Sequence, residues 1–323
     1  MKKVYNLTNK IISHNVFRYI LIFLSLIFIY FFFRENERIV SIIKNADYAK
    51  IVFLIFLSVL FIFTYAYLTL NFLREICGIK IKTKQWHLIY FNSQFLSSIP
   101  FFGILYRAKQ LKKYNLNYDK FVGLYITINW FFLFFSLIFF SIESYVFFAD
   151  AKLLNIKLPV LFLFSAMIIF IVPYISGIII NRLIIKFRLE SNFFFSRLQK
   201  LIKLFIINIF NFSLLRKFFY IFLIIHLLEF IVTTELVKSL ESSIDFNKTF
   251  YIFFGAQIID SLNFLPQNIL ISEIGIGLLT DRLDYDFELG VLIKLYMRFV
   301  IFFSSIFLAI FYNIYLKMIN FKN

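Results

Sequence analysis

Ionisable side chains that lie inside long apolar runs are the residues best able to do chemistry in this chain of 323 residues. A charge in apolar surroundings is expensive, about 2.5 to 3.5 kcal/mol on membrane-insertion scales, so each such group either binds a ligand or pairs with a second charge. The set comprises Glu143, His226, Glu229, Glu235, Asp260, Glu273, Lys294 and Arg298, with Arg107 at the edge of a run.

Arg107 offers a planar fork of donors that suits a lipid phosphate, although an arginine at this position could also reach water from the edge of a membrane. Glu273 could accept hydrogen bonds from a cationic group of a substrate, or it could pair with Arg298. Asp260 precedes Pro266 and Asn268 follows it. The predicted substrate-binding residues are therefore Arg107, Glu273, Arg298, Asp260 and Asn268.

His226 and Glu229 are three residues apart, the spacing of neighbours on one helical face, which predicts a hydrogen-bonded pair or a proton relay. Two such side chains do not make a metal site, and the Cys and His residues lack zinc-ligand spacing. The lone Cys77 excludes an intrachain disulfide. Because no P-loop, nucleophile elbow or zinc-helix motif occurs, we expect no metal, no cofactor and no enzymatic activity.

The composition defines the environment in which these groups must work. Hydrophobic residues make up 61% of the chain, aromatic residues 22%, and the mean hydropathy is +0.84, which predicts an integral membrane protein. The 34 Lys and Arg residues against 18 Asp and Glu give a formal charge of +16. Because the basic residues flank apolar runs, this charge indicates membrane orientation, and we expect no nucleic-acid partner.

Six apolar segments are long enough to span a membrane: residues 16–33, 51–72, 121–148, 158–181, 218–237 and 289–316. The first follows a basic N-terminus like a signal peptide, but it ends in Phe-Phe-Phe-Arg-Glu without a cleavage site, so we expect it to be retained. Two further stretches, 86–106 and 250–280, contain the central prolines Pro100 and Pro266, and they fit a simple span less well.

Loop charges orient the spans, because Lys and Arg collect in cytoplasmic loops. With both termini in the cytoplasm, only Glu75, Asp119 and Glu190 oppose the many basic residues of the inner segments. The pattern holds only if each proline-containing stretch enters and leaves on one side, so both are predicted to be re-entrant hairpins that face the protein interior. Residues 197–217 are predicted to form a cytoplasmic interfacial helix that contacts anionic headgroups.

The predicted fold is therefore an all-α, polytopic membrane helix bundle that forms a single domain. Its first half is residues 1–148, a connecting span and the interfacial helix occupy 149–217, and its second half is residues 218–323.

The two hairpins resemble each other. Pro100 precedes Arg107 by seven residues, and Pro266 precedes Glu273 by the same number. A Tyr-Asp pair then leads into a long span in each half. Because three spans separate the hairpins, the repeat is predicted to be inverted, an arrangement typical of secondary transporters. The residues that set the hairpin geometry are Pro100, Gly103, Pro266, Gly275 and Gly277.

This pattern, together with an arginine in the last span (Arg298), resembles the transmembrane region of the lysylphosphatidylglycerol synthases and the related flippase-like membrane proteins. The resemblance covers roughly residues 10 to 317, but only Gly103 accompanies the first proline, and Gln267 and Asn268 follow the second where the family usually has glycine. It implies a protein of the bacterial cytoplasmic (inner) membrane that moves an anionic, aminoacylated or lipid-linked molecule between leaflets. It also implies that membrane lipids are its partners, with envelope-biosynthesis enzymes as further candidates.

The chain ends soon after its last predicted span, so we expect the stand-alone form without the soluble synthase domain. Two other classes stay open. A polyprenyl-dependent glycosyltransferase would use acidic residues of an early outer loop, where Glu35, Glu37 and Asp47 lie. An accessory scaffold or channel of envelope biosynthesis is the other, although proline hairpins with opposite charges favour transport.

Overall fold

The computed structural model describes residues 37–97, 102–116, 118–148, 152–153, 156–187, 192–262 and 271–320. The chain divides into two units, residues 1–47 and 48–323. In the first unit the described residues form the short helix α3 (Glu37–Asn45) and lead on to Asp47.

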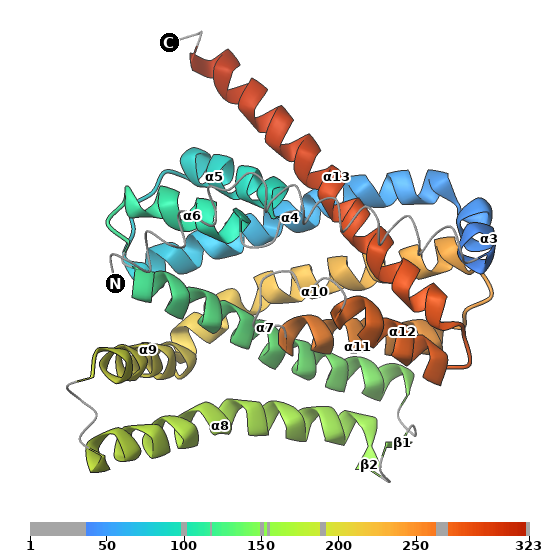
Figure 1. Ribbon diagram of the computed structural model, residues 1–323. Helices are drawn as coiled ribbons and strands as arrows, with labels where there is room; N and C mark the ends of the chain where they lie inside the picture. Colours follow the sequence, from blue (N-terminus) through green and yellow to red (C-terminus); the bar gives the residue numbers. More distant parts are fainter. Residues whose placement is uncertain are drawn as a thin grey trace. The chain divides into compact units, whose positions relative to one another are not determined.

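The described part of the second unit is helical apart from one small hairpin, β1 (Lys152–Leu153) and β2 (Ile156–Lys157). Its helices, coloured along the sequence in Figure 1, are α4 (Tyr48–Cys77), α5 (Thr83–Leu96), α6 (Phe102–Lys112), α7 (Tyr118–Phe147), α8 (Leu158–Lys186), α9 (Phe193–Ile209), α10 (Phe212–Leu240), α11 (Phe246–Leu262), α12 (Ile271–Arg282) and α13 (Phe287–Asn320).

Five of these helices, α4, α7, α8, α10 and α13, are long and apolar enough to cross a membrane. They confirm five of the six predicted spans, while the predicted span 16–33 lies outside the described residues. The chain is thus a multi-pass, helical membrane protein. Many large apolar side chains face outward, as lipid contact requires, and of the five long helices α8 is the least buried within the protein.

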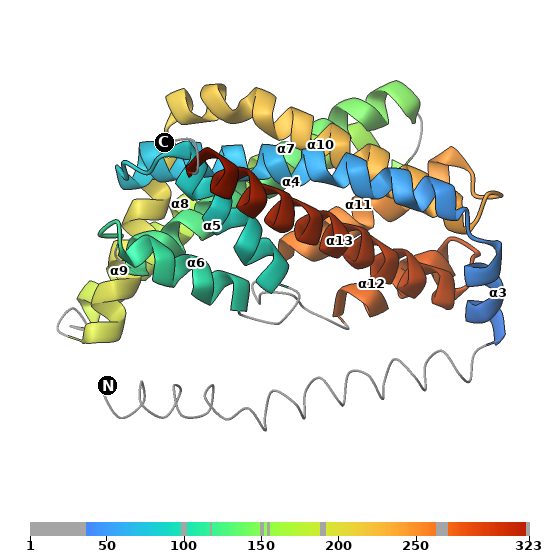
Figure 2. The same cartoon turned by 90° about the horizontal axis from the view of Figure 1, so that it is seen from above.

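α4 and α10 lie side by side and run in opposite directions. Lys50 at the start of α4 pairs with Glu235 near the end of α10 at 2.8 Å, and Lys217 near the start of α10 pairs with Glu75 near the end of α4. Stacked aromatic rings fill the space between them, with Phe72 and Phe218 at 4.2 Å between ring centroids. α13 packs along α4 as well (Figure 2), and the Ser304 hydroxyl donates to the Ile55 carbonyl at 2.6 Å.

The first proline-containing stretch consists of α5 and α6, which pack against each other on either side of residues 98–101. Pro100 itself lies outside the described residues. The Tyr114 hydroxyl, just after α6, donates to Gln85 near the start of α5 at 3.1 Å, so the outer ends of the pair are adjacent. Gly103 permits the close approach, because a Cβ there would lie 2.5 Å from the Ser93 carbonyl oxygen.

α11 and α12 form a second pair of the same kind around residues 263–270, which contain Pro266 and Asn268 and lie outside the described residues. Lys248 near the start of α11 donates to the Leu283 carbonyl, just after α12, at 2.8 Å. Gly275 faces Ile259 of α11, and Gly277 faces Phe287 at the start of α13. Both stretches are therefore antiparallel helix pairs whose two outer ends lie together.

The outer ends of the first helix pair and those of the second lie at opposite ends of the second unit. The first is connected to the end of α4, and the second follows the end of α10, which lies beside the start of α4. Both terminate in the same way, with Asn115 (φ 58°) and Asp284 (φ 63°) in the left-handed region. The amide of Leu116 donates to Leu111 at 3.3 Å and that of Tyr285 to Thr280 at 3.1 Å, the hydrogen bond of a Schellman cap.

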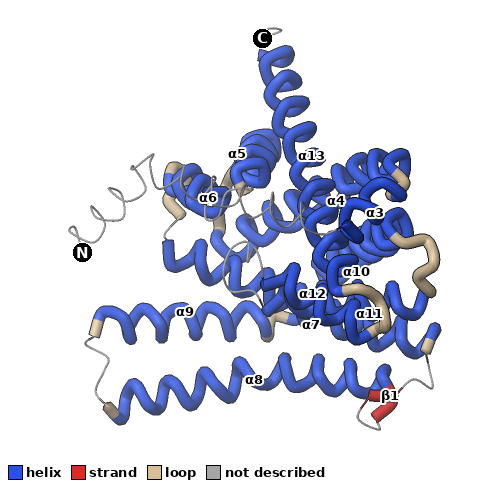
Figure 3. The backbone as a smooth tube through the Cα atoms, turned by 45° about the vertical axis from the view of Figure 1, so that its right-hand side comes forward, coloured by secondary structure: helices blue, strands red, loops and turns tan. Residues whose placement is uncertain are grey.

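The prediction of one interfacial helix over residues 197–217 was wrong in its extent. α9 ends at Ile209, and α10 begins after Asn211, whose side chain accepts a hydrogen bond from the Leu214 amide at 3.2 Å. Arg216 and Lys217 therefore belong to the first turns of a long apolar helix. Figure 3 shows α9 beside α8. The side chains of Ile202 and Ile206 on α9 lie against Gly177 of α8.

Candidate functional site

Arg107 belongs to α6, and its side chain lies inside the protein in contact with residues of α5 and α7. It is only 5% exposed. Its Nε donates to the Ser93 hydroxyl at 2.6 Å, Nη2 donates to Gln94 Oε1 at 3.2 Å, and Nη1 donates to the Tyr125 hydroxyl. The guanidinium carbon also lies 4.6 Å from the centroid of the Tyr90 ring. This burial disagrees with the alternative of an arginine that reaches water from the membrane edge.

The partners of Arg107 are all neutral. Within the described parts of the chain, no carboxylate lies within ion-pairing distance of it. Three of its five N–H groups are used by the bonds above, which leaves a positive charge and two donor hydrogens without a negative partner. A buried guanidinium in this state is suited to an anion.

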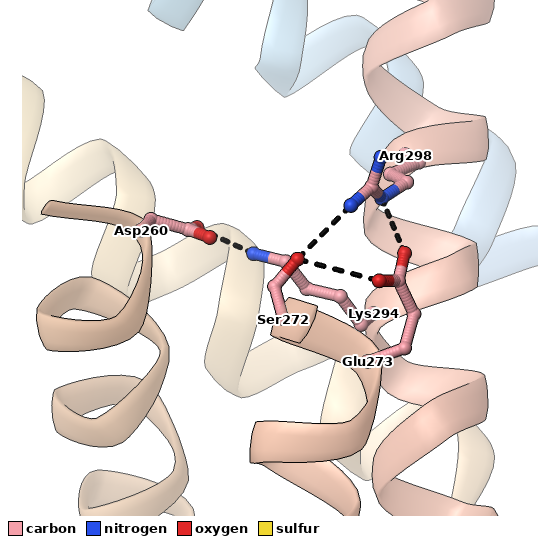
Figure 4. Close-up of polar contacts among 5 residues, drawn as sticks. All are labelled: Asp260, Ser272, Glu273, Lys294 and Arg298. Carbon is pink, nitrogen blue, oxygen red and sulfur yellow. Dashed lines mark hydrogen bonds and ion pairs between the residues drawn. The ribbon is translucent and has the colours of Figure 1, made fainter. Parts of the chain in front are cut away.

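A second charged group lies where α11, α12 and α13 meet (Figure 4). Lys294 of α13 is 6% exposed and pairs with Asp260 of α11. One turn further along α13, Arg298 Nε contacts Glu273 Oε1 at 2.6 Å, and its Nη2 donates to the Ser272 hydroxyl at 2.9 Å. The predicted substrate-binding residues Asp260, Glu273 and Arg298 thus lie in two adjacent ion pairs that join the second helix pair to the last span.

A cavity of about 170 Å³ lies between α4, α7, α10 and α11. Its wall combines aromatic rings with polar groups: Phe61, Tyr65, Asn129, Phe132, Glu229, Gln257 and Asp260. Of the predicted site residues, Glu229 and Asp260 line it, whereas Arg107 and Glu273 do not. Arg107 is nevertheless connected to it through two rings, since Tyr90 lies under Arg107 and 6.2 Å from Tyr65 between ring centroids.

The predicted pair of His226 with Glu229 is replaced by a pair between helices. His226 Nε2 lies 3.0 Å from Oε1 of Glu143 on α7, and the rings of Phe139, Phe140 and Phe253 surround the imidazole. The Glu143 side chain is itself only 16% exposed. His226 and Glu229 diverge because α10 packs against α7 on one side and faces the cavity on another.

Sequence patterns did not reveal the neutral side chains that hold Arg107: Tyr90, Ser93, Gln94 and Tyr125. A signal was present, since Ser93 and Gln94 interrupt an apolar stretch shortly before Pro100. Lys294 was also left without a predicted partner. Among the described residues, no group of three or more His, Cys, Asp or Glu side chains is arranged to hold a metal ion.

Comparison of the chain with protein families, curated proteins and solved structures found no match. Function must therefore be inferred from the fold and the site alone. Together these define a multi-pass membrane protein with charged groups buried among its spans.

Proposed function

We propose that this protein moves an anionic lipid, or a lipid-linked anionic molecule, between the leaflets of its membrane. The observation that carries the proposal is the burial of Arg107 with neutral partners. Placing a guanidinium in a membrane protein interior without a carboxylate costs several kcal/mol, and a phosphate that binds there would recover part of this cost through bidentate hydrogen bonds.

The helix pairs supply the second support. Each resembles a broken span whose two outer ends lie together, and the pairs open at opposite ends of the second unit. In secondary transporters, broken helices of inverted repeats surround the substrate site, and rocking of the halves exposes it to each side in turn. We infer that both pairs are re-entrant and are related as an inverted repeat.

The orientation follows from the charges. Basic residues gather at three places: between α4 and the first turn of α5 (Lys80, Lys82 and Lys84), at the end of α6 and just after it (Lys109, Lys112 and Lys113), and in the first turns of α10 (Arg216 and Lys217). All of these lie at the end of the second unit where the first helix pair opens. We place this end in the cytoplasm by the positive-inside rule, and the bacterial cytoplasmic membrane is the location that fits this function.

The test compares Arg107→Lys with wild-type protein reconstituted in vesicles that contain fluorescent phosphatidylglycerol. Lysine keeps the charge but loses the planar fork, so we expect lipid translocation to fall at least about tenfold while thermal stability in detergent falls only slightly. Lys109→Gln is the matched control, because it removes an exposed cation from the same helix and should leave translocation unchanged.

Equal translocation by the wild-type and lysine proteins would show that the fork of Arg107 does not bind the lipid. Vesicles in which even the wild-type protein moves no phosphatidylglycerol would contradict the proposed function. Fluorescent phosphatidylcholine, which carries no net charge, tests whether an anionic headgroup is required.

A further inference from the structure

Among the described residues of the second unit, the charged side chains inside the helix bundle pair with one another, with two exceptions. Asp260 pairs with Lys294, Glu273 with Arg298, and Glu143 with His226. Arg107 is one exception, and Glu229 is the other: it forms no ion pair with the described residues, and its buried Oε2 has no hydrogen-bond partner among them. The two are separated by the rings of Tyr90 and Tyr65.

Glu229 borders the cavity of about 170 Å³, which is large enough for a few water molecules. The same wall contains Gln257, a neutral polar neighbour of Glu229. Gln257 is 3% exposed and accepts a hydrogen bond from Ser136, but its Nε2, although near Glu229, makes no hydrogen bond of normal geometry with any described residue. Gln257 brings a donor hydrogen but no positive charge to Glu229, so this carboxylate, whose buried Oε2 has no hydrogen-bond partner of normal geometry among the described residues, still lacks a counter-charge.

The charged and titratable groups around Glu229 leave it available. Tyr65 faces it from α4, and α7 contributes the neutral Asn129. From α11 comes Asp260, which is held by Lys294 of α13. On α10 itself, His226 is held by Glu143 of α7. Each nearby cation that could neutralise Glu229 is thus committed to another carboxylate.

We infer that this cavity binds a small monovalent cation, a proton or Na⁺, with Glu229 as its anionic ligand. Asn129, Tyr65 and Asp260 offer further oxygen atoms on the same wall, which are the ligands that hard cations prefer. Glu229, Asn129 and Tyr65 all lie well inside their helices, α10, α7 and α4, away from both helix ends. The cation would neutralise a carboxylate that has no ion-pair partner among the described residues.

The cation site is a separate inference from lipid movement, because binding can be measured on purified protein without a lipid substrate. If the protein transports lipid, the site would provide its coupling ion, as cation sites at mid-depth do in secondary transporters. A protein that binds the cation but moves no lipid would contradict only the proposed function. A protein that moves lipid but binds no cation would contradict only the cation site.

Infrared difference spectroscopy of the full-length protein in detergent tests the inference in two arms. In the first, lowering the pH should produce the carbonyl band of a buried carboxylic acid. In the second, replacing K⁺ by Na⁺ at constant pH and ionic strength should shift a carboxylate band and raise the melting temperature. A response in the first arm identifies a proton, and a response in the second identifies Na⁺.

Glu229→Gln should abolish the response, whereas Glu241→Gln, at the C-terminal cap of α10, should leave it unchanged. Should Glu229→Gln fail to fold, Glu229→Asp retains the carboxyl group and should shift the acid band or raise the Na⁺ midpoint about tenfold. A wild-type protein that responds in neither arm overturns the inference, as does a response that survives in a folded Glu229→Gln protein.

Discussion

The carboxylate of Glu273 is 5% exposed, while the guanidinium that it contacts, that of Arg298, is 30% exposed. Glu273→Gln removes one charge of this pair and leaves Arg298 partly buried without it. Breaking a fully buried pair costs about 3 to 5 kcal/mol, and we expect about 1 to 3 kcal/mol here because water reaches Arg298. Thermal unfolding in detergent measures the loss as a lower melting temperature.

The more exposed pair between Lys50 and Glu235 provides the control. Both side chains are about one-third exposed, so Glu235→Gln should change the melting temperature very little. The double variant Glu273→Gln with Arg298→Gln should recover part of the lost stability, since it leaves no unmatched charge. Equal effects of Glu273→Gln and Glu235→Gln would mean that burial does not decide the strength of the Glu273 pair.

At this scale the sequence identified which residues are charged within apolar runs, but it could not identify their partners. Helical spacing suggested that His226 meets Glu229, yet the contact of His226 is with Glu143, 83 residues earlier. Pairing between residues far apart in the sequence depends on which helices pack together, and a single amino-acid sequence does not show this. The pair of Glu273 with Arg298 was among the alternatives because few opposite charges were available in the last span.

Among the helices, α12 and α13 approach each other at Gly290. A Cβ at this position would lie 2.3 Å from the Thr280 Oγ1, 2.5 Å from the Ile276 carbonyl oxygen and 2.7 Å from the Gly277 Cα. Two of these are backbone atoms, which cannot move unless the helices separate. We expect Gly290→Ala to lower stability by about 1 to 3 kcal/mol, measured by thermal unfolding in detergent.

Gly123→Ala is the matched control for this prediction. Gly123 also lies in a long helix, but the nearest atom to an added Cβ there is a leucine methyl at 3.7 Å, an ordinary contact. Because alanine favours helix more than glycine does, Gly123→Ala should be neutral or stabilising by up to about 1 kcal/mol. Similar losses in the two variants would argue against close packing of α12 on α13.

Apolar length predicted the long helices well, because a span needs about 20 residues and little else. Breaks between helices were harder to predict where no proline marks them. α9 and α10 are separated at Phe210 and Asn211 within a segment that looks continuous by composition, and only the capping side chain of Asn211 hints at the boundary. The two stretches that were singled out for their prolines, 86–106 and 250–280, each overlap a pair of packed helices, although Pro100 and Pro266 themselves lie outside the described residues.

For the whole molecule, the opposite openings of the two helix pairs make a topological prediction. In a Cys77→Ser background, the single substitutions Lys113→Cys and Asp281→Cys should introduce thiols that react with an impermeant reagent from opposite faces of the membrane. Both positions are exposed. Asp281 is preferable to Asp284, because the positive φ of Asp284 disfavours cysteine.

In right-side-out cells, the reagent should label the Asp281→Cys protein at once, and it should label the Lys113→Cys protein only after the membrane is permeabilised. Labelling of both variants from one face would rule out the inverted relation between the helix pairs. Labelling in the reverse order would keep the relation but place the basic end outside.

The ion pair between Asp260 and Lys294 joins two helices that leave the ribosome at different times. When α11 and α12 emerge during synthesis, Asp260 and Glu273 have no cation to meet, because Lys294 and Arg298 are encoded later. Unpaired carboxylates insert poorly into lipid, so the translocon would hold the second helix pair at its lateral gate until α13 arrives. A chain truncated before Lys294 should therefore fail to integrate its second helix pair and be degraded. We therefore expect stable insertion of the second helix pair to depend on the last span, which carries the cations Lys294 and Arg298.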